Sequence, residues 1–486
     1  MYQIDFKKPE HVHFIGIGGI SMSGLAEILM DEGFTVSGSD SHKSDLTEHL
    51  EAKGAQVFYG QRASNIIDGI DVVVYTAAVH ADNPEYAAVV AKEIPMLSRA
   101  ELLGQMMKNY KYAVGIAGTH GKTTTTSMVT EILLAAGADP TISVGGILNS
   151  IGGNIRVGGS DIFVTEACEY TNSFLSFFPN MEVILNIEED HLDFFKDLED
   201  IRDSFKKFVQ LIPEDGVVVI NSDIERYEEI VDGADCRVIT CGKLAGSDYQ
   251  AENIVYDEYA RASFDLVMKN AATDDSVGRS DVNESVSAAG LGEQNEDVVR
   301  VRVSLGVPGE HNVYNALAAA ALCQALGIDM ESIKNGLRKF TGTNRRFEKK
   351  GELAGVTIID DYAHHPREIA ATLETAKNYP HKKLWCVFQP HTYTRTRAFL
   401  DQFAEVLAAA DEVVLADIYA ARETDTLGVS SADIAERIEK LGTKAHHFRS
   451  FDEIENFILE NCVHGDLLIT MGAGDIVKVG ENLLGL

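Results

Sequence analysis

Residues 113–124 read AVGIAGTHGKTT, and this stretch decides the fold of the chain. An apolar run with the length of a strand passes directly into a loop with two glycines, and a Thr-rich segment with helical character follows. In this context backbone N–H groups and a helix N-terminus bind phosphate groups. We therefore expect Lys122 to reach the terminal phosphates of a nucleotide and Thr123 to hold Mg²⁺.

The loop departs from the general G-x-x-x-x-G-K-[ST] pattern, because Ile116 stands where the first glycine would fall. An accidental Gly-Lys-Thr sequence at a helix cap is the alternative explanation. The order of strand, loop and helix is what phosphate binding demands, and it favours a phosphate loop.

A second glycine-rich loop, residues 16–24, also follows an apolar strand, and Asp40 ends the next expected strand. This spacing is typical of dinucleotide-binding domains, in which the acid binds a ribose hydroxyl. Ser21 replaces the third glycine of that pattern, so the match is weak evidence for NAD. Another nucleotide diphosphate would use the same loop.

Acidic residues follow two of the expected strands. Glu166 ends a strand about 40 residues after the phosphate loop, where open α/β sheets place their ligand groups. It is a candidate Mg²⁺ ligand. Residues 186–193 (NIEEDHLD) follow another strand and place several acids and His191 at the same sheet edge.

Two further polar pairs each allow two explanations. Asn312 and Asn315 open an Ala-rich helix, where they are either helix caps or an adenine site. Arg345 and Arg346 provide two forks for phosphate or carboxylate groups, whereas paired surface arginines are the simpler explanation. A functional role is favoured in so acidic a chain.

Short apolar runs alternate with helical stretches, which predicts an α/β fold with parallel sheets covered by helices. At 486 residues the chain is too long for one core. We expect three α/β domains, over residues 1–108, 109–343 and 344–486. The segment 269–296 is rich in Asp, Ser, Asn and Gly without a period, which predicts a mobile insertion.

The chain carries a formal net charge of -33, from 42 basic and 75 acidic residues. Such a charge repels nucleic acid and anionic membranes, so an anionic ligand must be bound by a local group of cations. The six cysteines are scattered without a C-x-x-C pair, as in a reducing cytoplasm. Without an apolar signal core or a run of about 18 apolar residues, we expect a cytoplasmic protein that does not insert into membranes.

With these residues assembled, the sequence resembles the Mur ligase family from end to end, apart from the segment 269–296. Within the family it is most similar to the members that add L-alanine to UDP-N-acetylmuramate. The segments that carry the resemblance are Gly16-Ile17-Gly18-Gly19 with Met22-Ser23-Gly24, Gly38-Ser39-Asp40, the loop 118–124, Glu166, Asp190-His191, Gly309-x-His311-Asn312-x-x-Asn315, Arg345-Arg346-Phe347, Asp360-Asp361-Tyr362-Ala363-His364-His365-Pro366 and Gln389-Pro390-His391.

The resemblance implies an ATP-dependent ligase that forms an amide bond through an acyl phosphate during peptidoglycan synthesis. It implies that the first and third domains are Rossmann-like and that the central one is a P-loop-type ATPase domain with a parallel sheet. The implied cofactors are ATP and two Mg²⁺ ions, for which Mn²⁺ can substitute. The implied partners are the small molecules UDP-N-acetylmuramate, L-alanine and ATP, and an equilibrium between monomer and dimer is compatible with them. No nicotinamide is expected at the first glycine loop.

The resemblance also implies a role for each candidate residue. The catalytic residues would be Lys122, Glu166 and His191, and the metal ligands Thr123, Glu166 and His191. ATP would contact Gly118, Thr119, His120, Gly121, Lys122, Thr123, Thr124, His311, Asn312, Asn315, Arg345 and Asp361. The UDP-sugar would contact Gly16, Gly18, Gly19, Ser39, Asp40, Thr76 and Arg346. The amino acid would contact His364, His391 and Arg395, with Arg397 as a further candidate.

Two positions depart from the family pattern. Several relatives hold a second metal with a carbamylated lysine, and alignment places Phe205 at that position with Lys206 beside it. The alanine-adding members also lack the lysine, so no carbamylation is expected unless the alignment slips by one residue. Thr392 stands where an arginine is expected, so one contact to the amino-acid carboxylate is either missing or supplied by Arg395.

Three other functions explain parts of the sequence. A related ligase recycles murein tripeptide onto the same sugar nucleotide, but residues 22–24 and 389–391 favour alanine. A nucleotide-binding regulator could keep the fold without the activity, but Lys122, Glu166 and His191 are intact. An NAD-dependent dehydrogenase would explain the first glycine loop and leave the second unexplained.

Overall fold

The computed structural model describes residues 2–76, 79–192, 194–269, 298–421 and 423–486. The expected insertion at 269–296 lies, except for Lys269, outside the described residues. The chain divides into two compact units. The first contains Met1–Glu189, Asp197–Cys241 and Ala318–Gly336, and the second contains Asp190–Lys196, Gly242–Leu317 and Leu337–Leu486. The sheets fall into three α/β regions, which confirms the predicted fold class, while the expected boundaries near residues 108 and 343 stay predictions.

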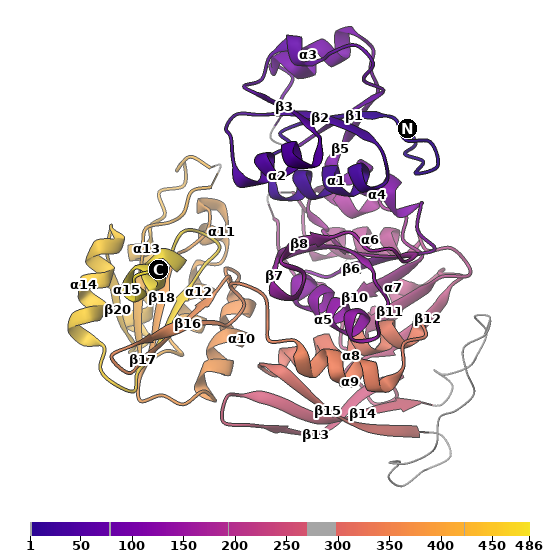
Figure 1. The fold of residues 1–486 in the computed structure, drawn as a ribbon. Helices are drawn as coiled ribbons and strands as arrows, with labels where there is room; N and C mark the ends of the chain where they lie inside the picture. Colours follow the sequence, from indigo (N-terminus) through magenta and orange to yellow (C-terminus); the bar gives the residue numbers. More distant parts are fainter. Residues whose placement is uncertain (1, 77–78, 193, 270–297, 422) are drawn as a thin grey trace. The chain divides into compact units, whose positions relative to one another are not determined.

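The first sheet is parallel throughout and has the order β3-β2-β1-β4-β5. Its order reverses between β1 and β4, and open α/β sheets bind ligands beyond the carboxyl ends of the strands at such a point. In Figure 1 this indigo sheet has α3 on one face and α1 and α2 on the other. The elements are β1 (His11–Ile15), α1 (Ile20–Asp31), β2 (Thr35–Asp40), α2 (Asp45–Lys53), β3 (Gln56–Tyr59), β4 (Val72–Tyr75), α3 (Pro84–Ala91), β5 (Met96–Ser98) and α4 (Arg99–Met107).

The larger sheet of the first unit has the order β12-β11-β10-β6-β9-β7-β8. Its strands are parallel except for β8, which is antiparallel to β7. The elements are β6 (Tyr112–Ala117), α5 (Lys122–Ala135), β7 (Thr141–Leu148), β8 (Gly153–Arg156), β9 (Ile162–Ala167), the 3-10 helix η3 (Tyr170–Ser176), β10 (Met181–Ile184), α6 (Leu198–Val209), β11 (Val217–Asn221), α7 (Tyr227–Val231) and β12 (Arg237–Cys241).

The register of this sheet brings three loops to one edge. Ile116 of β6 pairs with Glu166 of β9, and Ala117 pairs with Ile184 of β10. Because all three strands are parallel, the chain leaves each of them at the same edge. β10 ends at Ile184, and the side chain of Asn186 accepts a hydrogen bond from the phosphate loop instead of continuing the ladder.

The second unit contains three antiparallel strands, β13 (Tyr249–Tyr256), β14 (Arg261–Lys269) and β15 (Val298–Pro308). It also contains a sheet of order β16-β17-β21-β18-β19-β20, parallel except for the edge strand β16. These strands are β16 (Glu348–Leu353), β17 (Val356–Asp361), β18 (Leu384–Phe388), β19 (Glu412–Leu415), β20 (Lys444–His447) and β21 (Leu467–Met471).

The remaining helices are α8 (His311–Ala325), α9 (Met330–Lys339), α10 (Pro366–Lys377), α11 (Tyr393–Ala398), α12 (Leu400–Leu407), α13 (Ser431–Lys440), α14 (Phe451–Asn461) and α15 (Val477–Leu484). The Ala-rich helix expected from Asn315 begins earlier, at His311. In the part of the chain that the structure describes, no helix combines the length and apolar character needed to cross a bilayer.

The acidic residue Glu182 lies inside the larger sheet of the first unit. Glu182 of β10 pairs with Gly115 of β6 and Val218 of β11, and its side chain is inaccessible to solvent. A Cβ atom on Gly115 would lie 3.3 Å from the ring of Phe208, so this face of the sheet is covered by α6. Neither carboxylate oxygen of Glu182 has a hydrogen-bond partner among the described residues. Burial raises the pKa of Glu182 well above its usual value near 4.5.

A raised folded-state pKa means that stability is fully present at low pH and is lost as the pH rises above the unfolded-state value. The loss approaches about 1.4 kcal/mol per pH unit. The variant Glu182→Gln has no charge to bury, so we expect calorimetry to show a gain in melting temperature over the wild type that is larger near pH 8 than near pH 5. Replacing the exposed Glu258 with Gln should leave the pH dependence of the melting temperature as in the wild type. An equal change of melting temperature with pH in the two variants would contradict a neutral Glu182.

Candidate functional site

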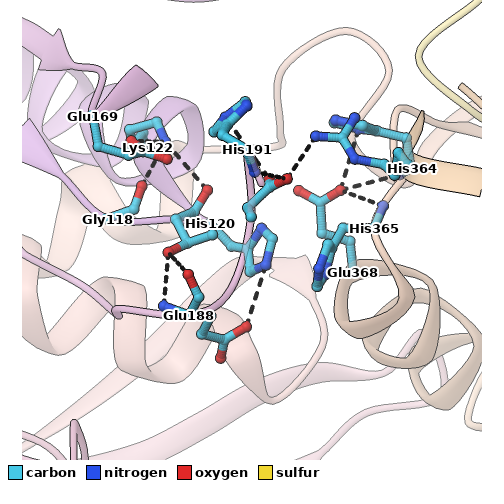
Figure 2. Close-up of polar contacts among 12 residues, drawn as sticks. Gly118, His120, Lys122, Glu169, Glu188, His191, His364, His365 and Glu368 are labelled. Carbon is cyan, nitrogen blue, oxygen red and sulfur yellow. Dashed lines mark hydrogen bonds and ion pairs between the residues drawn. The ribbon is translucent and has the colours of Figure 1, made fainter. Parts of the chain in front are cut away.

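The expected phosphate loop connects β6 to α5. Gly118 and Gly121 have φ angles of +144° and +84°, which other residues rarely adopt. A Cβ atom on Gly118 would also lie 2.9 Å from the Cβ of Leu185. Lys122 is the first residue of α5, and its ammonium group donates to the carbonyls of Gly118 and Thr119 and contacts the carboxylate of Glu169 (Figure 2).

The segment after β10 holds the phosphate loop in place. The amide of Thr119 donates to the carbonyl of Asn186 over 3.1 Å, and the amide of His120 donates to the Asn186 side chain over 2.7 Å. The amide of Glu188 donates to Thr119 Oγ1 over 2.9 Å. Glu188 Oε2 lies 3.3 Å from His120 Nε2. The segment 186–188 therefore fixes the shape of the loop.

Glu166 lies at the carboxyl end of β9, one strand from the phosphate loop. Its carboxylate accepts a hydrogen bond from the amide of Gly145, and a Cβ atom on Gly145 would lie 2.8 Å from Glu166 Oε2. A larger residue at position 145 would therefore force the Glu166 carboxylate to move. Glu166 and Thr123 supply the oxygen ligands that Mg²⁺ prefers, so the donor set fits the ion.

In the second unit, Asp190 and Arg395 form a buried ion pair with a distance of 2.6 Å from Oδ1 to the guanidinium. Burial alone would raise the pKa of Asp190, but the charge of Arg395 outweighs it and holds this pKa well below its usual range. His191 follows in a left-handed conformation with φ of +52°, and its Nε2 lies 3.8 Å from Asp190 Oδ2. Arg395, expected to contact the amino acid, is thus already paired with a carboxylate, whereas Arg397 is exposed.

The two asparagines expected at adenine are buried at the start of α8. The amide of Asn312 donates to the carbonyl of Pro308 over 2.7 Å, and the amide of Asn315 donates to Asn312 Oδ1 over 3.0 Å. These bonds fix the entry into the helix, which favours a capping contribution. His311 beside them is exposed.

Arg345 is committed to contacts inside the second unit. Its guanidinium lies 2.9 Å from Asp360 and donates to the carbonyls of Gly472 and Gly474 over 2.7 and 3.1 Å. Asp361 accepts from the amides of Phe347 and Ala363, each over 2.8 Å, and burial raises its pKa to about 6.

Arg345 therefore shapes the edge of the β17-β21 sheet and has few donors left for ATP. Arg346, by contrast, is partly exposed, stacks on Tyr362 and lies 3.9 Å from Glu368.

The residues expected at the amino acid lie at the carboxyl edge of the same sheet. The rings of His364 and His391 are 5.7 Å apart, and the ring of His391 stacks on Tyr419. His364 Nδ1 lies 3.0 Å from the carbonyl of Tyr362, and burial lowers the pKa of His364 to about 4, so its ring is neutral near pH 7. Nδ1 of His391 has no partner among the described residues.

In the first sheet, the loop after β1 lies where the strand order reverses between β1 and β4. A Cβ atom on Gly16 would lie 3.5 Å from Thr76, which follows β4. The amide of Gly18 donates to Asp40 over 2.8 Å, while Gly19 is exposed. The hydroxyl of Ser39 is buried and donates to Glu85, so Ser39 supports the loop through its carbonyl rather than through its side chain.

Three family profiles match the chain in order. The Mur ligase catalytic domain matches residues 11–111, the Mur ligase middle domain residues 116–323 and the glutamate ligase domain of Mur ligases residues 345–474. The chain belongs to the Mur ligase family. As a Mur ligase it is an ATP-dependent enzyme that forms amide bonds.

Individual relatives match over nearly the whole length. The chain is 59% identical to the UDP-N-acetylmuramate--L-alanine ligase of Lachnospira eligens, and the match covers 100% of each chain. It is 29% identical to the crystal structure of the UDP-N-acetylmuramate-alanine ligase of Thermotoga maritima, with a TM-score of 0.75 and 98% of each chain covered. A murein peptide ligase from Psychrobacter arcticus, 24% identical with a TM-score of 0.67 over 98% of each chain, shares the fold.

Phe205, which we expect at the position of the carbamylated lysine of other Mur ligases, is a buried aromatic residue. Phe205 of α6 is inaccessible to solvent and packs against Phe174, with ring centroids 5.3 Å apart. Lys206 lies at the surface, 3.2 Å from Asp232. The one-residue slip that would restore a carbamylated lysine therefore has no support in the geometry.

One acid at the site, Glu169, has no counterpart in the sequence-based prediction, and it pairs with Lys122. Glu188 belongs to the acidic segment 186–193 expected at this sheet edge, and the structure adds its pairing with His120. Glu169 lies three residues after Glu166, just beyond the end of β9. Its place at the carboxyl end of this strand is the feature from which it could have been predicted. Thr392, which stands where an arginine is expected, has a structural contact: its hydroxyl caps the helix α11 that carries Arg395.

We expect Arg345→Lys to lower the free energy of unfolding of the second unit by about 2 to 4 kcal/mol, because a lysine cannot satisfy Asp360 and two carbonyls at once. Arg346→Lys is the matched control: the Arg346 side chain is 32% exposed, so its cost should stay below about 1 kcal/mol. Urea unfolding monitored by circular dichroism measures both. Equal losses in the two variants would show that the fork of Arg345 is not structural.

Proposed function

We propose that this Mur ligase joins L-alanine to the carboxylate of UDP-N-acetylmuramate at the expense of ATP. The observation that carries the proposal is the convergence of Lys122, Glu166 and Glu169 at one edge of the β6-β9 sheet. The 59% identity over the full length to a ligase of that name supports the choice of substrates. We place the reaction in the cytoplasm.

The chemistry follows from the problem that a carboxylate poses. Its oxygen is a poor leaving group, and transfer of the γ-phosphoryl group of ATP converts the carboxylate into an acyl phosphate. The amine of alanine then attacks the carbonyl carbon, and phosphate leaves with the oxygen. Lys122, at the start of α5, offsets negative charge on the phosphoryl group during transfer, while the backbone amides of the loop 118–121 orient it.

Magnesium, when bound, neutralises phosphate charge and polarises the transferring group. The residues that would hold it are Thr123 and Glu166 for one ion and His191 for a second. Glu166 is positioned for this by the amide of Gly145, which fixes one of its oxygens. His191 lies beside the buried Asp190, with 3.8 Å between its Nε2 and Asp190 Oδ2.

The two substrates fit the two remaining sheet edges. The loop at Gly16, Gly18 and Gly19 would receive the diphosphate of the UDP-sugar, with Asp40 and Thr76 beside it. At the carboxyl ends of β17 and β18, the neutral ring of His364 would accept a hydrogen bond from the ammonium group of alanine. Arg395 would bind the carboxylate of alanine after releasing Asp190.

Phosphate release from ATP with UDP-N-acetylmuramate and Mg²⁺ tests the proposal, comparing L-alanine, murein tripeptide and no amine. We expect release that depends on alanine and falls more than about 100-fold in Lys122→Ala, because the main cation of the site is lost. Lys207→Ala removes an exposed lysine of α6 and should keep wild-type activity.

The alternatives predict different results in the same assay. Release with tripeptide alone would move the chain to the recycling ligases. No release with either amine, despite ATP binding, would indicate a regulator.

A further inference from the structure

Every hydrogen-bond donor of the phosphate-loop lysine is already occupied. A lysine ammonium has three N–H groups. In Lys122 they reach the carbonyl of Gly118, the carbonyl of Thr119 over 3.2 Å and Glu169 Oε2 over 2.9 Å (Figure 2). A phosphate oxygen can therefore bind Lys122 only if one of these partners is released.

The contact with Glu169 is a buried ion pair. The side chains of Lys122 and Glu169 are only 15% and 3% exposed. Burial alone would lower the pKa of Lys122, but the negative charge of Glu169 outweighs it, and the pKa stays above its usual value. Two charges at such a depth depend on each other, because neither is solvated by water.

Glu169 is held in place by a turn with its own support. It precedes η3, in which Thr171 and Asn172 adopt left-handed conformations with φ of +56° and +57°. Such a conformation is costly for a β-branched residue and persists only where packing enforces it. Phe174 of the same turn stacks on Phe208 with ring centroids 4.3 Å apart and meets Phe205 edge to face. The backbone of the turn that follows Glu169 is thus held by the core beneath it.

We propose that Glu169 is an internal counter-ion that occupies Lys122 in the nucleotide-free enzyme and is exchanged for phosphate when ATP binds. It is a positioning residue: it keeps the ammonium charged and aimed along the loop, and it gives way to the nucleotide. His120 and Glu188 repeat the pattern, since the second basic side chain of the loop also faces an acid. ATP binding then exchanges one anion for another at Lys122. The release of Glu169 from Lys122 lowers the affinity of the enzyme for ATP.

The variant Glu169→Gln keeps the size of the side chain and removes its charge. We expect it to bind ATP about tenfold more tightly than the wild type in calorimetry without UDP-sugar or alanine, which corresponds to 1.4 kcal/mol. The nucleotide-free variant should melt at a lower temperature than the wild type, because Lys122 is left without a counter-charge, and ATP should raise its melting temperature by more. A residue that only supports the fold would instead weaken ATP binding when replaced.

Two further variants complete the experiment. Glu131→Gln, on the same helix α5 as Lys122, should bind ATP as the wild type does. Glu169→Asp keeps the charge but shortens the side chain by one methylene, and we expect a smaller gain of about threefold; this variant decides the question if Glu169→Gln does not fold. Unchanged or weaker ATP binding in the Glu169 variants overturns the inference.

The inference rests on the proposed binding of ATP by the phosphate loop, and the two can fail separately. A wild-type protein that does not bind ATP contradicts the proposed function. Normal ATP binding by the wild type, with no gain in the Glu169 variants, contradicts the counter-ion alone.

Discussion

A buried ammonium group needs a counter-charge, and in this chain that requirement falls on Lys122 at the start of α5. Glu169 supplies the charge from the end of the neighbouring strand β9, while the carbonyls of Gly118 and Thr119 take the remaining donors. The loop can therefore keep its shape without a nucleotide. Within a chain whose overall charge is strongly negative, the charge of Lys122 is thus balanced by an acid of the chain itself.

The convergence of these groups follows from the parallel sheet. β6, β9 and β10 leave the sheet at one edge, so three segments that are far apart in sequence meet there. Each segment then braces another: Asn186 binds the backbone of the phosphate loop, and Gly145 leaves room for the Glu166 carboxylate. The aromatic contacts of Phe174 with Phe205 and Phe208 fix the turn that carries Glu169. Rigidity at this edge is thus a property of the sheet and of the core under it.

The second unit uses its charged residues differently. Arg345 forms hydrogen bonds with Asp360 and with the carbonyls after β21, and Asp361 accepts hydrogen bonds from two backbone amides. Such contacts shape the edge of the β17-β21 sheet and leave His364, His391 and Arg346 as the groups with capacity for a ligand. A motif residue can therefore be essential to the site because it builds the wall of the site, without touching a substrate.

The sequence by itself determined the α/β class, the strands that carry the glycine loops and the identity of Lys122, Thr123 and Glu166 as candidates, because apolar periodicity and glycine spacing are local properties of the chain. It did not reveal the antiparallel pairs β7-β8, β13-β14 and β14-β15, in each of which a shift of register interrupts the regular ladder.

Only the tertiary structure showed that Glu169 neutralises Lys122, that the Ser39 hydroxyl faces Glu85 and that the ring of Phe205 packs against Phe174 in the core. Each of these facts depends on which side chains meet across a sheet or a core, and no pattern along one strand contains that information.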